Sequence, residues 1–173
     1  MQTWAISGNS GQSKMTIRVL FVCHGNICRS PMAEFIFKNI VNQRNLSDRF
    51  EINSAATSRE EIWGNRGNPI YPPAQEQLRR HHIPFTDHRA TQVSIEDYRR
   101  YDYLVYMDRS NEINLKRIVN GDPENKCFRL LDFTDSPKDV ADPWYTGDFE
   151  QTYEDLVNGC NALLSLIMEK KNG

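Results

Sequence analysis

Short apolar runs alternate with amphipathic stretches along most of the chain. Four apolar runs predict β-strands, near residues 17–22, 50–54, 102–107 and 127–131. Apolar residues recur at helical spacing over 33–41 and 153–167, so both segments predict helices that pack on a core. Two further helices are expected, one opened by Pro72 and Pro73 and running to about His81, the other starting at Asp108 or Ser110.

This alternation predicts an α/β fold with three layers, α/β/α, around a central four-stranded parallel sheet of Rossmann-like type. The 173 residues suit one domain, which we expect over 15–173. Residues 1–14 are polar and rich in Ser, Gly and Gln, so we expect a disordered extension or an added leader, with Met15 as the native start. Right-handed crossovers place the loops after the strands at one edge, where ligands of such sheets bind.

The loop after the first strand joins a thiol, Cys23, to a guanidinium, Arg29. A loop between a strand and a helix points backbone N–H groups at one spot, and the helix N-terminus adds positive partial charge, so an anion is expected there. The same field favours a thiolate, which makes Cys23 a candidate nucleophile near neutral pH. The planar fork of Arg29 can hold two phosphate oxygens at once.

Local residue choices fit this interpretation of the loop. Gly25 and Asn26 tolerate the backbone angles of a tight turn. Pro31 suits the first position of the following helix, which leaves Ser30 as the expected helix cap. The alternative is a buried cysteine in a purely structural loop, which would have no need of Arg29 at its centre.

The segment Val22–Glu34, with the sequence VCHGNICRSPMAE, closely resembles the signature of the low-molecular-weight protein tyrosine phosphatases. Further segments recur in that family's order over about Thr16 to Lys170, namely Ser54–Ser58, Asp102–Asp108 with Ser110 and Asn111, and Asp142–Tyr145 with Gly147. The resemblance implies the phosphatase fold and hydrolysis of phosphotyrosine and small aryl phosphates. It also implies a phosphocysteine intermediate, and phosphate or other oxyanions as product and inhibitors.

The resemblance assigns the chemistry to three residues. Cys23 attacks phosphorus, Arg29 binds the phosphate, and Asp142 protonates the leaving oxygen before activating water. Pro143 would stiffen the loop that carries Asp142. From the sequence alone, Asp142 could equally be a turn residue before proline.

Other members of the phosphate-binding loop are expected to support Cys23, and they are His24, Gly25, Asn26, Ile27, Cys28 and Ser30. The resemblance implies that Asn26 holds the loop in shape, partly through Ser54, and that the Ser30 hydroxyl bonds the Cys23 sulfur. Each of these could instead be a simple turn or cap residue. Cys28 is expected to form a reversible disulfide with Cys23 under oxidants, and the alternative is a small buried filler.

Substrate choice is expected to depend on aromatic residues at the mouth of the site. Trp144 and Tyr145 would wall a slot that favours phosphotyrosine over phosphoserine. Ile27 favours phosphotyrosine too, since similar family members that act on phosphoarginine carry Thr there. The loop over 57–73 is about four residues longer than in relatives and holds Glu60 where many carry Trp, so Trp63 either serves as a lip aromatic of the cleft or lies in a surface excursion.

Composition excludes several other classes. A net charge of −2 argues against bulk nucleic-acid binding, and the chain holds neither a secretory signal nor a run of about 18 apolar residues. Four cysteines without paired CxxC spacing fit neither a disulfide scaffold nor structural zinc, and the histidines His81, His82 and His88 show no accompanying metal ligands. We expect a cytoplasmic monomer with no metal, no cofactor, and a phosphotyrosine protein or peptide as its partner.

Two other functions remain open at this point. Thioredoxin-linked arsenate reductases share a similar signature but need two further cysteines near mid-chain, and none lies between Cys28 and Cys127. A non-catalytic phosphate-binding module would be expected to lack the nucleophile, the arginine or the acid. All three are present in this chain.

Overall fold

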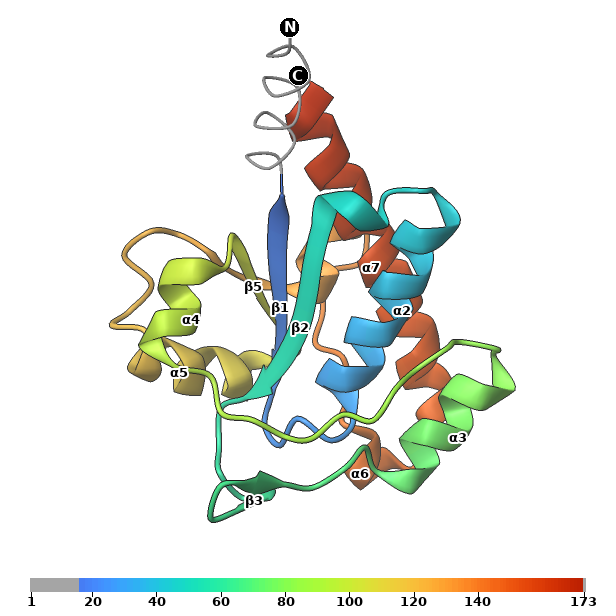
Figure 1. The fold of residues 1–173 in the computed structure, drawn as a ribbon, viewed down its shortest axis with the longest axis vertical. Helices are drawn as coiled ribbons and strands as arrows, with labels where there is room; N and C mark the ends of the chain where they lie inside the picture. Colours follow the sequence, from blue (N-terminus) through green and yellow to red (C-terminus); the bar gives the residue numbers. More distant parts are fainter. Residues whose placement is uncertain (1–15, 173) are drawn as a thin grey trace, which may run out of the picture.

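A parallel four-stranded sheet forms the middle layer of the computed structural model, which describes residues 16–172 (Figure 1). Its strand order is β2-β1-β5-β6, and every neighbouring pair is parallel. The strands are β1 (Ile17–Cys23), β2 (Phe50–Ala56), β5 (Tyr103–Tyr106) and β6 (Cys127–Arg129). All four lie where the apolar runs predict them, so the predicted α/β sheet is confirmed. The expectation for residues 1–14 lies outside the described residues.

Helices cover both faces of the sheet (Figure 1). One face carries α2 (Arg29–Gln43), α3 (Pro72–Arg80) and α7 (Phe149–Asn172). The other carries α4 (Ile95–Arg100) and α5 (Arg109–Ile118). Shorter elements complete the described chain: η1 (Ser47–Arg49), β3 (Ile62–Trp63), β4 (Arg66–Gly67), η2 (Leu130–Phe133) and α6 (Pro143–Thr146). No helix of residues 16–172 is long and apolar enough to cross a membrane.

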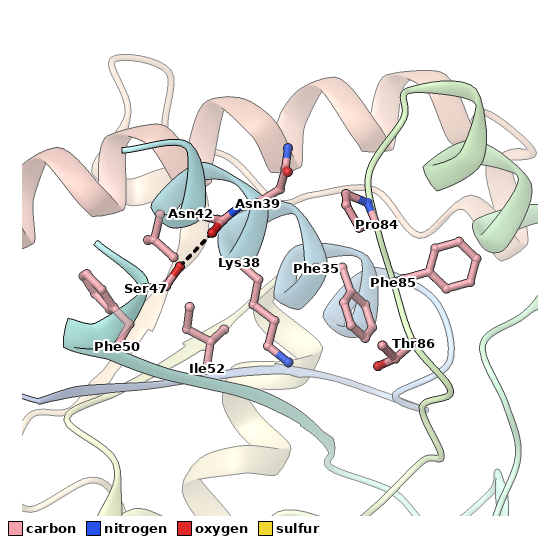
Figure 2. Close-up of a pocket in the computed structure, with 11 residues that line it drawn as sticks. Phe35, Lys38, Asn39, Asn42, Ser47, Phe50, Ile52, Pro84, Phe85 and Thr86 are labelled. Atoms are coloured by element: carbon pink, nitrogen blue, oxygen red, sulfur yellow. Dashed lines mark hydrogen bonds between the residues drawn. The ribbon is translucent and has the colours of Figure 1, made fainter. Parts of the chain in front are cut away.

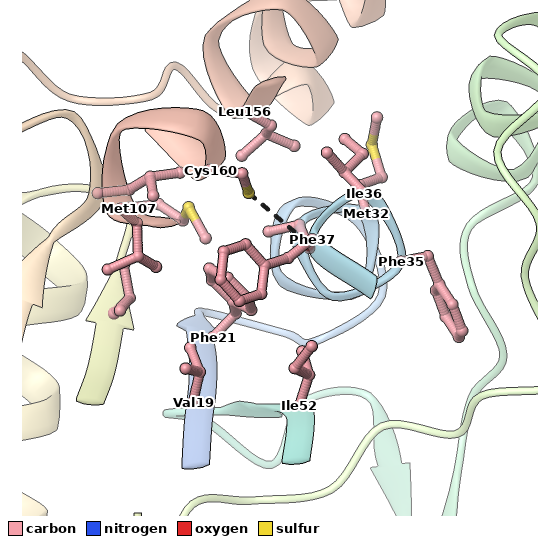
Figure 3. Packing of buried hydrophobic residues seen from close by; sticks show 14 of the residues in the cluster. Val19, Phe21, Met32, Phe35, Ile36, Phe37, Ile52, Met107, Leu156 and Cys160 are labelled. Atoms are coloured by element: carbon pink, nitrogen blue, oxygen red, sulfur yellow. Dashed lines mark hydrogen bonds between the residues drawn. The ribbon is translucent and has the colours of Figure 1, made fainter. Parts of the chain in front are cut away.

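Alternating side chains of β1 divide the core into two parts. Val19 and Phe21 belong to the cluster beneath α2 and α7, where Phe21 and Phe37 meet edge to face (Figure 3). Leu20 and Val22 belong to the cluster beneath α4 and α5. A strand buried on both faces has no polar side, which explains why β1 is apolar from Val19 to its end. Its last residue, Cys23, therefore ends a strand that is paired on both edges and buried on both faces.

Two helix starts differ from the sequence interpretation. The prediction that Ser30 caps the first helix, with Pro31 at its first position, is wrong. The helix α2 begins at Arg29 after Cys28, and no side chain caps it. The Ser30 hydroxyl points instead toward Cys23 and Asn26, because those polar groups are buried beside it and need partners.

The second difference is a helix that the sequence analysis did not predict. Ser94 caps α4, and Asp97 returns a bond to the Ser94 backbone, which forms a capping box. The spacing of Ser94 and Asp97 is visible in the sequence and could have predicted the start of α4. Asp108, one of the two expected starts, caps α5 through a similar box with Asn111.

Candidate active site

Cys23 ends β1 at the carboxyl edge of the sheet, and its side chain is buried beside Ser30. Its Sγ lies 3.1 Å from Ser30 Oγ, and the Ser30 backbone N–H donates to the sulfur at 3.4 Å. The Ser30 oxygen already accepts a bond from Asn26 Nδ2 at 2.7 Å, so its own proton is free to point at the sulfur. The Ser30 groups and the start of α2 thus place hydrogen-bond donors and positive partial charge beside the sulfur.

Asn26 holds the phosphate-binding loop from behind. It is fully buried and has a positive φ of 59°, a conformation that asparagine tolerates better than most residues. Its amide donates to Ser30 Oγ and, at 3.0 Å, to Ser54 Oγ on β2. Its carbonyl oxygen accepts from the Thr91 N–H at 3.1 Å. Every polar atom of the side chain is thus paired, which fixes the turn of the loop.

The sequence analysis missed a buried acid and an imidazole that support this network. Ser54 Oγ donates to Glu34 Oε1 at 2.6 Å, and Lys38 Nζ lies 2.6 Å from Glu34 Oε2. His88 Nε2 lies 3.0 Å from the Asn26 carbonyl oxygen, and His88 Nδ1 lies 3.7 Å from Glu34 Oε1. The fold therefore brings the Glu34 carboxylate beside His88, although the two residues lie far apart in the sequence. Burial lowers the pKa of His88, and the Glu34 carboxylate opposes that shift.

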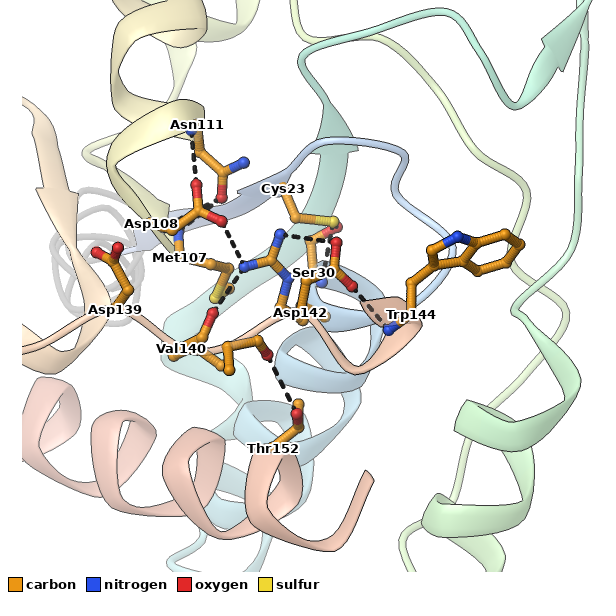
Figure 4. Close-up of polar contacts among 12 residues, drawn as sticks. Cys23, Ser30, Met107, Asp108, Asn111, Asp139, Val140, Asp142, Trp144 and Thr152 are labelled. Carbon is orange, nitrogen blue, oxygen red and sulfur yellow. Dashed lines mark hydrogen bonds and ion pairs between the residues drawn. The ribbon is translucent and has the colours of Figure 1, made fainter. Parts of the chain in front are cut away.

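Arg29 lines the cleft with Cys23 and is almost fully buried. Figure 4 labels its partners Asp108, Val140 and Asp142. Its Nη1 donates to Asp108 Oδ2 at 2.8 Å and to the Val140 carbonyl at 2.7 Å, while its Nη2 lies 3.5 Å from Asp142 Oδ2. Burial acts to lower the pKa of Arg29, but Cys23 and the carboxylates of Asp108 and Asp142 together raise it. The guanidinium therefore stays charged, and Asp108 is a contact that the sequence analysis did not foresee.

Asp142 sits at the start of α6, directly before Pro143. Its Oδ1 accepts a bond from the Trp144 backbone N–H at 3.0 Å, which leaves Oδ2 on the side of Arg29. The carboxylate is partly exposed and lines the same cleft as Cys23. This arrangement puts a carboxylate that can carry a proton in the same cleft as the Cys23 sulfur, with the Arg29 cation close to both.

A cleft of about 390 Å³ opens above Cys23. It is lined by the whole loop 23–29 and by Glu60, Glu61, Asp142, Trp144 and Tyr145. His24 Nε2 lies 3.0 Å from Glu60 Oε2, so an ion pair joins the loop to the opposite lip when His24 is protonated. The two aromatic side chains are strongly exposed, which leaves them free to contact a flat ligand.

Of the two alternatives for Trp63, the structure agrees with the surface excursion, because Trp63 is not among the residues that line the cleft. Residues 62–67 form the β3–β4 hairpin, which leaves the Trp63 side chain 73% exposed. The hairpin is packed tightly at its base, since a Cβ on Gly67 would lie 2.0 Å from the Ala90 carbonyl oxygen. Glu60 and Glu61 occupy the lip instead, so it is acidic rather than aromatic.

A second hollow, of about 470 Å³, lies between α2, the start of β2 and the segment 84–86 (Figure 2). Its lining is mostly apolar and includes Phe35, Phe50 and Phe85. Lys38 is the charged residue of its lining, and that ammonium is paired with Glu34. The residues that line this hollow hold no thiol and no carboxylate, unlike those of the cleft above Cys23.

Known proteins match this chain over nearly all of its described length. A family model described as low molecular weight phosphotyrosine protein phosphatase matches residues 18–172. The chain belongs to this family. The low molecular weight protein-tyrosine-phosphatase YfkJ of Bacillus subtilis is 40% identical over 157 residues, 90% of this chain and 98% of that protein. Its crystal structure has a TM-score of 0.85 at 39% identity and covers 90% of this chain and 97% of that chain.

Two further similar proteins are named for different substrates. The human low molecular weight phosphotyrosine protein phosphatase is 42% identical over 154 residues, 86% of this chain and 94% of that protein. DARP, a Drosophila arginine phosphatase, has a TM-score of 0.77 at 29% identity and covers 87% of this chain and 98% of that chain. Membership in the phosphotyrosine phosphatase family makes this protein a cysteine-dependent phosphatase.

Proposed function

We propose that this phosphatase hydrolyses phosphotyrosine through a phosphocysteine on Cys23, with Arg29 as the phosphate ligand and Asp142 as the general acid and base. The observation that carries the proposal is that these three side chains, far apart in sequence, line one cleft. The other candidate, a phosphate-binding module without chemistry, has no use for a carboxylate opposite the sulfur.

In the first step, the Cys23 thiolate attacks phosphorus and the bond to the leaving oxygen breaks. Arg29 and the N–H groups of the loop bind the three equatorial oxygens of the transferring phosphoryl group. These donors stabilise the negative charge that the oxygens share in the transition state. Asp142, protonated at this stage, donates its proton to the departing phenolate. The result is a thiophosphate ester on Cys23 and a free tyrosine side chain.

In the second step, the ionised Asp142 takes a proton from water as that water attacks the phosphocysteine. The Cys23 sulfur leaves as a thiolate, and the Ser30 hydroxyl, 3.1 Å away, is placed to donate to it. Phosphate is released and Asp142 is protonated again for the next cycle. One carboxylate therefore serves both steps.

The cleft favours phosphotyrosine as the substrate. Its entrance is formed by Trp144 and Tyr145, both of which line the cleft and offer flat apolar faces to an aryl ring. A phosphoserine side chain would leave the phosphate short of Cys23. Ile27 in the loop presents an apolar side chain at the cleft, where phosphoarginine would bring a second charged group.

We also propose that Cys28 protects Cys23 from irreversible oxidation. Burial raises the pKa of the Cys28 thiol, as do the charges of Cys23 and Asp142, while Arg29 opposes them. Cys28 thus stays a thiol, and a peroxide would oxidise Cys23 first to a sulfenic acid. Attack by the Cys28 sulfur would then expel water and form a disulfide, which a thiol reductant reverses. A reducing compartment such as the cytoplasm suits this chemistry.

The test is hydrolysis of p-nitrophenyl phosphate in the presence of EDTA, followed by matched peptides that carry phosphotyrosine, phosphoserine or phosphoarginine. We expect turnover that EDTA does not change, with phosphate released from the phosphotyrosine peptide at least about 100-fold faster than from the others. Release mainly from phosphoarginine would reassign the substrate. A folded protein that releases no phosphate from any substrate would favour the binding module.

A further inference from the structure

Tyr71 lies between the two halves of the active site. Its backbone N–H donates to the carbonyl of Ile27, in the phosphate-binding loop, at 2.8 Å. Its ring packs against the Trp144 ring with centroids 5.0 Å apart and an interplanar angle of 47°. Its ring also lies near that of Phe149, in the first turn of α7, with centroids 6.1 Å apart. One residue therefore contacts the loop that holds phosphate and the segment that carries Asp142.

Trp144 and Asp142 are directly joined. The Trp144 backbone N–H donates to Asp142 Oδ1 at 3.0 Å, and this bond determines which carboxylate oxygen turns toward Arg29. Figure 4 shows the Trp144 indole extending away from that carboxylate. A shift of the indole would therefore move the N–H that orients the acid.

The segment around Asp142 needs such support because it has little structure of its own. The helix α6 has four residues and ends at Gly147, which has a positive φ of 74°. Before Asp142 the chain is anchored by the Val140 N–H, which donates to the Met107 carbonyl, and by Thr152 Oγ1, which donates to the Ala141 carbonyl. After Asp142, the Trp144 ring packs on the Tyr71 ring. Tyr71 is itself held by its backbone bond to Ile27 and by its place directly before Pro72, the first residue of α3.

We propose that the ring of Tyr71 is a positioning element for the general acid, because it fixes Trp144 and thereby the Asp142 carboxylate relative to the phosphate-binding loop. This inference rests on the proposed role of Asp142. Tyr71 touches neither substrate nor the reacting atoms in this account. Its contacts with Trp144 and Phe149 are ring contacts, so the aromatic face, not the phenol, carries the effect.

The experiment compares Tyr71→Ala with Tyr71→Phe on a series of aryl phosphates whose leaving groups differ in basicity. Tyr71→Ala should slow kcat for phenyl phosphate about 10-fold, with a smaller loss for a dinitrophenyl phosphate, because a misplaced acid matters most for a basic leaving group. Tyr71→Phe should retain the wild-type dependence on the leaving group. Trp63→Ala, an exposed aromatic outside the cleft, is the matched control and should change neither rate.

A second arm separates this inference from the proposed function. In an Asp142→Ala background, adding Tyr71→Ala should cause little further loss, since the residue it positions is gone. Equal slowing of all leaving groups by Tyr71→Ala, or full additivity with Asp142→Ala, would overturn the role of Tyr71 alone. If Asp142→Ala itself showed no leaving-group dependence, the proposed role of Asp142 would fail first. Tyr71→Leu replaces Tyr71→Ala if circular dichroism shows that the alanine variant does not fold.

Discussion

A Cys23→Ser variant is expected to lose turnover of p-nitrophenyl phosphate by about 10⁴-fold or more, while it still binds phosphate. The serine hydroxyl stays protonated at neutral pH, so the attacking group is lost. Arg29 and the loop N–H groups remain, and with them the anion site. Initial rates give the first effect, and isothermal titration with inorganic phosphate gives the second.

Cys127→Ser is the matched control for that loss. Burial raises the pKa of Cys127 to about 12, with a smaller contribution from Asp122, so this thiol is protonated at neutral pH. It lies on β6 and does not line the cleft. The control should keep wild-type turnover. Residual activity of the Cys23→Ser variant within about 10-fold of wild type would mean that another group attacks phosphorus.

An Asp142→Ala variant is expected to lose about 10²- to 10³-fold in kcat/KM with phenyl phosphate, and much less with a dinitrophenyl phosphate. A basic phenolate needs a proton as it departs, whereas a nitrated phenolate leaves well without one. The measurement is the slope of log(kcat/KM) against leaving-group pKa, which should become steeper in the variant. The exposed Asp135, outside the cleft, provides a matched control through Asp135→Ala.

The same loss for every leaving group would mean that Asp142 positions Arg29 or the phosphate-binding loop and does not donate a proton. The geometry makes this a real alternative to test, because Asp142 Oδ2 lies 3.5 Å from Arg29 Nη2. Asp108 already provides Arg29 with a closer carboxylate at 2.8 Å. Arg29 therefore keeps an ionic partner in the Asp142→Ala variant, and the leaving-group slope isolates proton donation.

Local sequence was enough to predict the phosphate-binding loop, because Cys23, Asn26, Arg29 and Ser30 are neighbours in the chain and share one turn. The support behind the loop was not predictable in the same way. Glu34 reads as one more residue of α2, and His88 comes from a segment 62 residues beyond Asn26. Only tertiary folding brings these groups together, and no periodic pattern marks a buried hydrogen-bond network.

The sequence also predicted the aromatic residues at the mouth of the cleft only in part. Trp144 and Tyr145 lie directly after Asp142, so their place follows from that of the acid. Trp63 lies in the β3–β4 hairpin, whose path depends on the pairing of these two strands and on the close contact between Gly67 and Ala90. An aromatic residue at about the right distance in sequence was therefore a poor guide to the cleft wall.

The most direct test of the central claim is to trap the phosphorylated enzyme. Asp142→Ala should be mixed with p-nitrophenyl phosphate, quenched rapidly under conditions that preserve thiophosphate esters, and analysed by peptide mass spectrometry. p-Nitrophenolate leaves well without a proton, so the variant should still form the phosphocysteine. Without the Asp142 carboxylate to activate water, hydrolysis of the phosphocysteine should be slowed more, so it should accumulate. The account predicts one phosphate on Cys23 and none on Cys28, Cys127 or Cys160. Turnover with no phosphate on Cys23, or with phosphate on another residue, would contradict it.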